Sequence, residues 1–129
     1  MGLSQFDERK VNNGSLLVQH SDGTNDNNVW SAGAYGSHLD QIIVTHDDTI
    51  DHVLTVGIKE GSGNVILLGT VSVPAIAAGV MSTVEALNAI SAFIPNGLAV
   101  DSQATVVIAF TVALSSGKFG YLSVFAGDF

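Results

Sequence analysis

The sequence contains no cysteine, two prolines and one tryptophan among its 129 residues. The absence of cysteine excludes disulfide bonds, cysteine-based zinc sites and a cysteine nucleophile. Charged residues make up only 12% of the chain, about half of the roughly 25% that is usual for soluble domains. Four basic residues against 12 acidic ones leave a net charge of −8. Because a phosphate backbone requires a basic surface, we expect no direct binding to nucleic acid.

Apolar residues are abundant, at 47% of the chain, and the mean hydropathy is +0.40. A small monomer of this composition would have too few charged residues to cover its surface. We therefore expect either a membrane or other protein chains to cover part of it. The longest charge-free run, 61–84, is long enough to span a bilayer. It contains Asn64, Pro74 and four glycines, and its first part alternates like a strand. We therefore expect burial in a protein assembly and no membrane insertion.

The N-terminal stretch MGLSQFDERK is polar and lacks the apolar core of a signal peptide, so an intracellular product is expected. Residues 1–14 show no periodicity and are predicted to form an extended arm or flexible tail. The remaining residues, 15–129, are predicted to form a single domain, which is long enough to bury a core.

Several short strand patterns separated by Gly, Ser and Asp turns follow the arm. The predicted strands are 15–19, 29–32, 37–45, 51–60, 64–73, 105–114 and 119–129. Leu54, Val56 and Ile58 share one face of their strand, and Val65, Leu67, Val71 and Val73 share one face of the next, so the two form a hairpin across 61–63. Ser82 and Glu85 match a capping box and predict one short helix near 82–93. This pattern predicts an all-β, antiparallel, jelly-roll-like β-sandwich.

Histidine and aspartate are concentrated in the stretch VTHDDTIDHV, 44–53, which holds His46, Asp48 and His52 at the junction of two predicted strands. A hairpin centred near Thr49 would place the two histidines opposite each other, where with Asp48 they are weak candidates for metal ligands. Their spacing matches no established zinc or calcium motif. Aspartates are also common in turns, where they bind backbone N–H groups. We therefore favour a polar turn, with no metal and no cofactor.

Motifs for hydrolysis and phosphate binding are absent from the sequence. Ser37, His38 and Asp40 are the residue types of a catalytic triad, but neighbouring residues of a strand point to opposite faces, so Ser37 and His38 do not meet. No other residues form a catalytic pattern. We therefore expect that the protein is not an enzyme and has no catalytic residues.

Two groups of residues are candidates for contacts with other molecules. Trp30 and Tyr35 lie close together in a loop-rich region, where aromatic rings can stack on sugars, although a core position for Trp30 is the favoured interpretation. The second group combines the outward side of 105–114 with the arm, and we expect it to contact other subunits or a capsid. Its residues are Val107, Ala109, Thr111, Ala113, Phe6, Arg9 and Lys10.

A set of motifs resembles small structural proteins of tailed-bacteriophage head and tail gene clusters. The motifs are WSAGAYGS (30–37) with the apolar strand after it, DTIDHV (48–53), LLGTVSVPA (67–75) and GKFGYLSVFAGDF (117–129). The resemblance covers about three-quarters of the chain, omits the arm and implies a β-sandwich virion component without catalytic residues.

The resemblance and the composition together favour a capsid decoration (cement) protein. Such a protein would be a homotrimer that binds the major capsid protein on the outer head surface, where many modest contacts add up to firm attachment. It would be made in the host cytoplasm and would end up in the virion. A neck or tail component is the alternative within structural proteins. A carbohydrate- or cell-surface-binding module, using Trp30 and Tyr35, is the alternative from another class.

Overall fold

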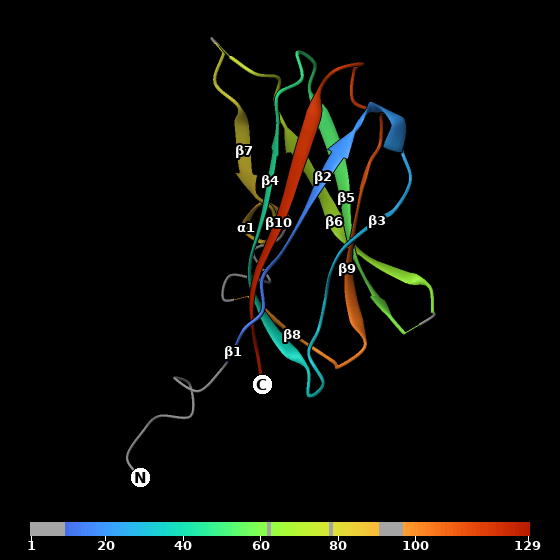
Figure 1. Ribbon diagram of the computed structural model, residues 1–129, viewed down its shortest axis with the longest axis vertical. Helices are drawn as coiled ribbons and strands as arrows, with labels where there is room; N and C mark the ends of the chain where they lie inside the picture. Colours follow the sequence, from blue (N-terminus) through green and yellow to red (C-terminus); the bar gives the residue numbers. More distant parts are fainter. Residues whose placement is uncertain (1–9, 62, 78, 91–96) are drawn as a thin grey trace.

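The computed structural model is a sandwich of two antiparallel β-sheets, which confirms the predicted all-β fold (Figure 1). It describes residues 10–61, 63–77, 79–90 and 97–129. Sheet A is the six-stranded sheet and sheet B the four-stranded one. The strands of sheet A are β1 (Lys10–Val11), β2 (Gly14–Gln19), β4 (Ser37–His46), β7 (Ser82–Glu85), β8 (Leu98–Val100) and β10 (Phe119–Asp128). Those of sheet B are β3 (Asn27–Ser31), β5 (His52–Glu60), β6 (Val65–Val73) and β9 (Ala104–Phe110).

The strand order is that of a jelly roll. Four antiparallel pairs are nested in the sequence: β5 with β6, β4 with β7, β3 with β9, and β2 with β10. The four pairs form one long two-stranded ribbon. The ribbon folds back on itself, so that β10 also pairs with β4, and β9 with β5. The two sheets therefore have the orders β2–β10–β4–β7 and β3–β9–β5–β6, with β1 and β8 added at the sides of sheet A. A double-sheet jelly roll of this kind contains two Greek keys.

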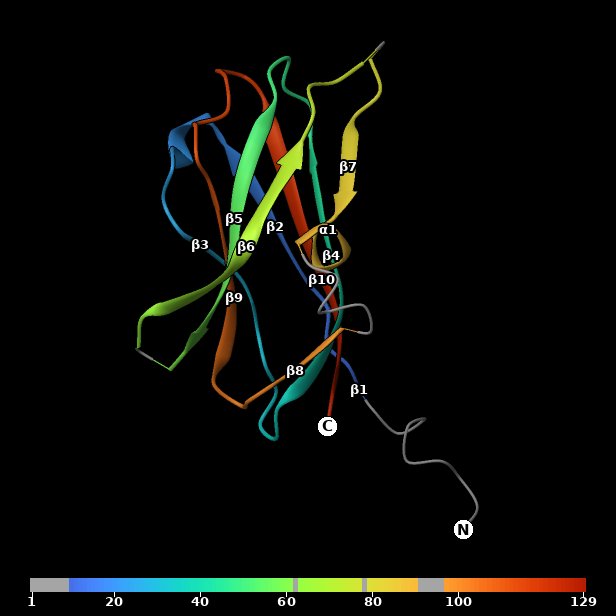
Figure 2. The same cartoon turned by 180° about the vertical axis from the view of Figure 1, so that it is seen from behind.

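The core lies between the sheets and follows the alternation seen in the sequence. Leu54, Val56 and Ile58 of β5 are buried, as their shared face predicts. The inward residues of β9 are Val106, Ile108 and Phe110, and those of β10 include Leu122 and Val124; all of them are buried in one continuous cluster. Figure 1 shows β2, β10 and β4 in front of β5 and β6, and Figure 2 shows the same sandwich from behind.

The hairpin of β5 and β6 forms as predicted, but the expected apolar face of β6 is broken. Val71 and Val73 are buried, whereas Val65 and Leu67 are exposed. The pairing shifts between Val56 and Gly57, where one extra residue of β6 is left unpaired. Such a bulge reverses the sides to which the following residues point and bends the strand. The tip of the hairpin therefore leaves the sandwich, as Figure 2 shows.

The helix begins later than predicted. Residues Ser82–Glu85 form strand β7, and the helix α1 covers only Ala86–Ile90, after which the expected residues 91–93 lie outside the described chain. The Ser82 hydroxyl donates to the carbonyl of Ala75 and does not cap a helix. The carboxylate of Glu85 instead accepts the N–H of Asn88 and that of Ile42. Pairing with β4 thus outweighs the local helical preference of this segment.

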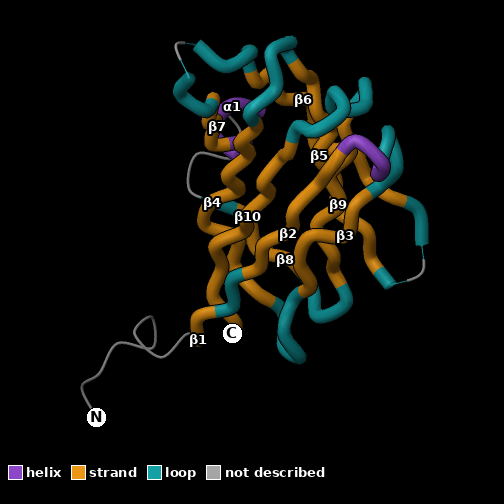
Figure 3. Tube along the Cα trace, turned by 45° about the horizontal axis from the view of Figure 1, so that its top comes forward, coloured by secondary structure: helices purple, strands orange, loops and turns teal. Residues whose placement is uncertain are grey.

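The predicted arm is described only from Lys10 onward. There, Lys10 and Val11 pair with Asp128 and Gly127 of β10, and Gly14 begins β2. Residues 1–9 of the arm lie outside the described chain. Figure 3 shows the loops gathered at the two ends of the sandwich. In the described part of the chain, no helix is long and apolar enough to cross a membrane.

Candidate functional site

The polar stretch 46–52 connects the two sheets at one end of the sandwich, which we call the His/Asp end. The prediction of a hairpin across this stretch is wrong, because β4 lies in sheet A and β5 lies in sheet B, so the two strands do not pair. The two histidines still meet, since each strand directs its histidine inward at the same end of the core. His46, Asp48 and His52 are all buried, and the two imidazole rings pack edge to face with their centroids 4.9 Å apart.

Asp48 is the centre of the hydrogen bonding at this end. Its Oδ2 atom accepts the ring N–H of His52 at 2.7 Å and the backbone N–H of Ser115 at 2.8 Å. Its Oδ1 atom accepts the N–H of Thr49 at 2.7 Å. Burial by itself would raise the pKa of Asp48, but these hydrogen bonds outweigh burial and hold the pKa well below its usual range. Asp48 therefore stays ionised inside the protein.

The ring of His46 is held from both sides. Its Nδ1 atom accepts the backbone N–H of Asp48 at 3.0 Å, and its Nε2–H donates to the carbonyl of Val73 at 3.0 Å. These two bonds select the neutral tautomer with hydrogen on Nε2, and they tie the end of β4 to the end of β6. A metal ligand needs a free ring lone pair, and the one on His46 is already used.

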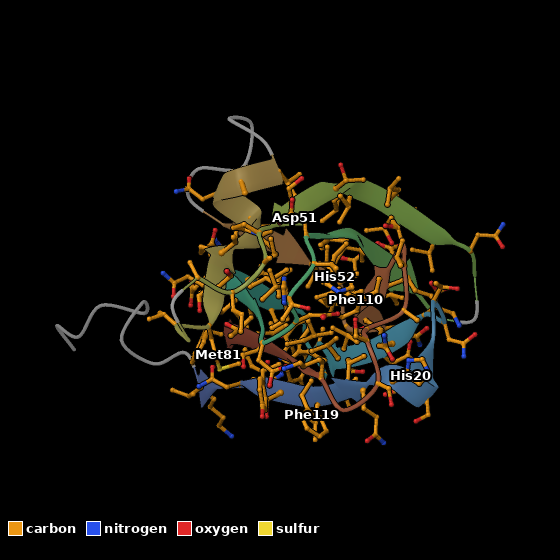
Figure 4. The ribbon with its side chains drawn as sticks, turned by 90° about the horizontal axis from the view of Figure 1, so that it is seen from above. His20, Asp51, His52, Met81, Phe110 and Phe119 are labelled. Carbon is orange, nitrogen blue, oxygen red and sulfur yellow. The ribbon has the colours of Figure 1, made fainter. Side chains whose placement is uncertain are left out.

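His52 packs against aromatic neighbours, as Figure 4 shows in a view onto this end. Its ring meets Phe110 edge to face with the centroids 5.2 Å apart. Its Nε2–H points to Asp48, and its buried Nδ1 atom has no hydrogen-bond partner among the described residues. Within that same part of the chain, no group of three or more His, Asp or Glu side chains is arranged to hold a metal ion.

The other two aspartates of the stretch bind different loops. Asp47 accepts the N–H of Phe119 at 2.8 Å, at the start of β10. Asp51 accepts the N–H of Ala75 at 2.8 Å, two residues after the end of β6. Together with Asp48, which holds Ser115, the three carboxylates join this stretch to two other connections, β6–β7 and β9–β10. The geometry thus agrees with the favoured interpretation, a polar turn whose carboxylates bind backbone N–H groups.

The lowered pKa of Asp48 predicts acid-sensitive stability. A folded-state pKa below that of an unfolded aspartate, about 3.9, adds stability that is complete above about pH 5 and is lost as the pH falls further. We expect the free energy of unfolding to fall by about 2 kcal/mol or more from this group between pH 5 and pH 2. Urea unfolding at a series of pH values measures this. The variant Asp48→Asn should show a flatter dependence, and an unchanged slope in the variant would contradict the assignment.

A second polar network joins both ends of the described chain at the opposite end of the sandwich. The hydroxyl of Ser37 donates to Asp128 at 2.6 Å, and the side-chain amide of Asn12 donates to the same oxygen at 2.8 Å. The Ser37 bond, opposed by burial and aided by Asn12, lowers the pKa of Asp128. A β-carbon at Gly33 would lie 2.5 Å from this carboxylate, so the close approach requires glycine.

This network decides against a catalytic triad at 37–40. The buried Ser37 hydroxyl points to Asp128, whereas His38 and the exposed Asp40 pair with each other at 2.9 Å. Neighbouring residues of β4 thus point to opposite faces, as expected. The role of Asp128 was missed in the sequence because its partners lie 91 and 116 residues away, and no local pattern connects them.

The candidate contact residues fall into three groups. Val107 and Ala109 lie on the outward side of β9 but are already buried within the chain, because β3 and β5 flank that strand. They therefore offer little surface to a partner. Thr111 and Lys10 are exposed and Ala113 is half-buried, while Phe6 and Arg9 lie outside the described residues. Strand β9 ends at Phe110, earlier than the predicted 114.

The two candidate stacking residues differ in how exposed their side chains are. Trp30 belongs to the core and donates its indole N–H to the carbonyl of Asn12 at 2.8 Å. The core interpretation of Trp30 is thus confirmed, and its ring is closed to a ligand. Tyr35, by contrast, is 84% exposed.

Known proteins provide no family assignment: no family model matches the chain, and a search of curated proteins finds no match.

Proposed function

We propose that the protein is a structural component of a bacteriophage virion, namely a decoration protein that binds the outer surface of the head as an oligomer, with a trimer favoured. The resemblance noted in the sequence motivates this proposal. The contacts at the two ends of the sandwich support it, because the motif residues there bind backbone groups and other side chains of the same chain. Their arrangement serves the stability of the scaffold.

The observation that carries the proposal is an uncharged outer face on sheet A. This outer face of sheet A comprises the outward positions of β2, β4 and β10 in the middle of the sheet. They are Ser15, Leu17, Gln41, Ile43, Thr45, Tyr121, Ser123 and Phe125. Tyr121 lies directly between Leu17 and Thr45, and Phe125 lies two residues further from Ser123 along the same strand.

This face is unusual for a surface that only meets water. Leu17, Tyr121 and Phe125 are 50%, 45% and 41% exposed, and no charged side chain lies among them. The cores of protein interfaces are depleted of charge and enriched in aromatic residues. The eight positions of this face therefore carry none of the net charge of −8, although Glu85 lies opposite Ile43 on β7 and the exposed Asp40 lies beside Gln41 at its border. A second subunit or a capsid protein can pack on the middle of the face without desolvating a charge there.

Capsid binding tests the proposal. The purified protein would be mixed with mature heads, lacking this chain, of the phage that encodes it, and the bound fraction measured by sedimentation. Saturable binding of hundreds of copies per head, with a higher temperature of head disruption, is the expected result. Saturation at a handful of copies would indicate a neck or tail component. A stable monomer that does not sediment with any phage particle would overturn the proposal.

A further inference from the structure

An open polar cleft lies at the end of the sandwich opposite the His/Asp end. Its volume is about 490 Å³, and three connections line it: Ala34 and Tyr35 between β3 and β4, Glu60 and Gly61 at the tip of the β5–β6 hairpin, and 101–103 between β8 and β9. Figure 1 shows the loops between β3 and β4 and between β8 and β9 at the lower end of the sandwich. No residue of the His/Asp end takes part in it.

The chemistry of the cleft combines an aromatic ring with hydrogen-bonding groups. Tyr35 has the largest exposed fraction among the exposed large hydrophobic residues of the described chain. The other lining residues include two acidic ones, Glu60 and Asp101, and two with polar side chains, Ser102 and Gln103. Among the described residues, no lysine or arginine lines the cleft, so an anionic ligand would meet like charge there. A ligand with many hydroxyl groups fits, because it donates to carboxylates and presents C–H faces to an aromatic ring.

The loops around the cleft are held by backbone contacts, so the site is formed in advance. Gly61 donates its N–H to the carbonyl of Gln103 at 3.1 Å, which joins the hairpin tip to the turn before β9. Within that turn, the backbone N–H of Ala104 donates to the backbone carbonyl of Asp101 at 3.1 Å. Gly36, next to Tyr35, has a φ of +85°, and a β-carbon there would lie 2.6 Å from the carbonyl of Val100. A preformed site loses less conformational entropy on binding.

We propose that this cleft binds a neutral saccharide unit, with Tyr35 stacking on the sugar ring and Glu60 and Asp101 accepting its hydroxyl hydrogens. An open, shallow cleft suits one or two terminal sugars of a larger glycan. The proposal goes beyond attachment to a capsid, because it gives the protein a second ligand on a surface separate from the outer face of sheet A.

Titration by NMR tests this proposal. Glucose, galactose, rhamnose and N-acetylglucosamine would each be added up to 50 mM, and the backbone N–H signals followed. At least one of these sugars should shift the signals of Tyr35, Gly61 and Ser102 with millimolar affinity. Tyr35→Ala should weaken that affinity about tenfold or more, Tyr35→Phe should largely preserve it, and Asp101→Asn should weaken it.

The matched control is Tyr121→Ala, which removes the other tyrosine of the chain, on the outer face of sheet A, and should leave the sugar titration unchanged. The N–H signals away from the cleft report whether each variant is folded. The proposal is overturned if none of the four sugars shifts the cleft signals. Spermidine and calcium would be titrated in the same way. The proposal is equally overturned if only one of these cations shifts the cleft signals, since the cleft would then be a cation site.

Discussion

Replacing Asp48 by alanine should lower the free energy of unfolding by about 3–5 kcal/mol. The substitution leaves three donors without their acceptor: the buried ring N–H of His52 and the part-buried backbone N–H groups of Ser115 and Thr49. Each donor gave up hydrogen bonds to water when the chain folded, and the carboxylate replaces those bonds. For a chain of this size, the melting temperature should fall by roughly 10–20 °C. Urea unfolding and calorimetry measure both quantities.

The matched control is Asp51→Ala. Asp51 belongs to the same stretch and has the same side chain, but it is exposed and accepts one backbone N–H, that of Ala75. Its loss should change the free energy of unfolding by no more than about 1 kcal/mol. If Asp48→Ala does not fold, Asp48→Asn allows the measurement, because the amide oxygen preserves one acceptor; its loss of stability should still exceed that of Asp51→Ala. Equal losses would show that burial of Asp48 has no special role.

Replacing Phe125 by aspartate should abolish assembly while leaving the chain folded. Phe125 lies on the outer face of sheet A, where a subunit or capsid contact would bury the new carboxylate without a partner. Aromatic residues at the centre of an interface commonly contribute more than about 2 kcal/mol each. We therefore expect self-association and head binding to weaken about a hundredfold or more. Analytical ultracentrifugation and co-sedimentation with heads measure the two effects, and Tyr121→Asp should act in the same direction.

Val53→Asp is the control for these variants. Val53 is 38% exposed, close to the exposure of Phe125, but it lies on sheet B, opposite Ser72 of β6. The substitution introduces the same charge on the other side of the sandwich and should leave assembly unchanged. If instead Val53→Asp disrupts assembly and Phe125→Asp does not, sheet B provides the contact surface and the assignment of the face is wrong.

The fold was largely predictable because local alternation and turn residues carry most of its information. The faces of Leu54, Val56 and Ile58 and the hairpin across 61–63 follow directly from a period of two. The broken apolar face of β6 could not be predicted in this way. The bulge beside Gly57 depends on how β5 and β6 pair, and it does not change the alternation of residues in the sequence. The segment Ser82–Glu85 was predicted as helix because its pairing with β4 was invisible in the sequence.

The candidate site was predicted in composition but not in geometry. The stretch 46–52 contains the right residues, and their use as backbone acceptors follows from ordinary turn chemistry. Its place between two sheets depends on the jelly-roll winding, which brings β6, β9 and β10 to the same end. The same winding joins Asn12 and Ser37 to Asp128. The cleft beside Tyr35 likewise assembles from three connections distant in sequence, so only its aromatic residue was a candidate beforehand.

A cryo-electron microscopy map of the phage particle tests the central claim most directly, because it shows which surface of the chain meets its neighbours. The outer face of sheet A, including Tyr121 and Phe125, should be buried against another copy or the shell, in many copies on the head surface. A map in which this face points to solvent while the chain is held through sheet B, or a particle without the chain, would contradict it.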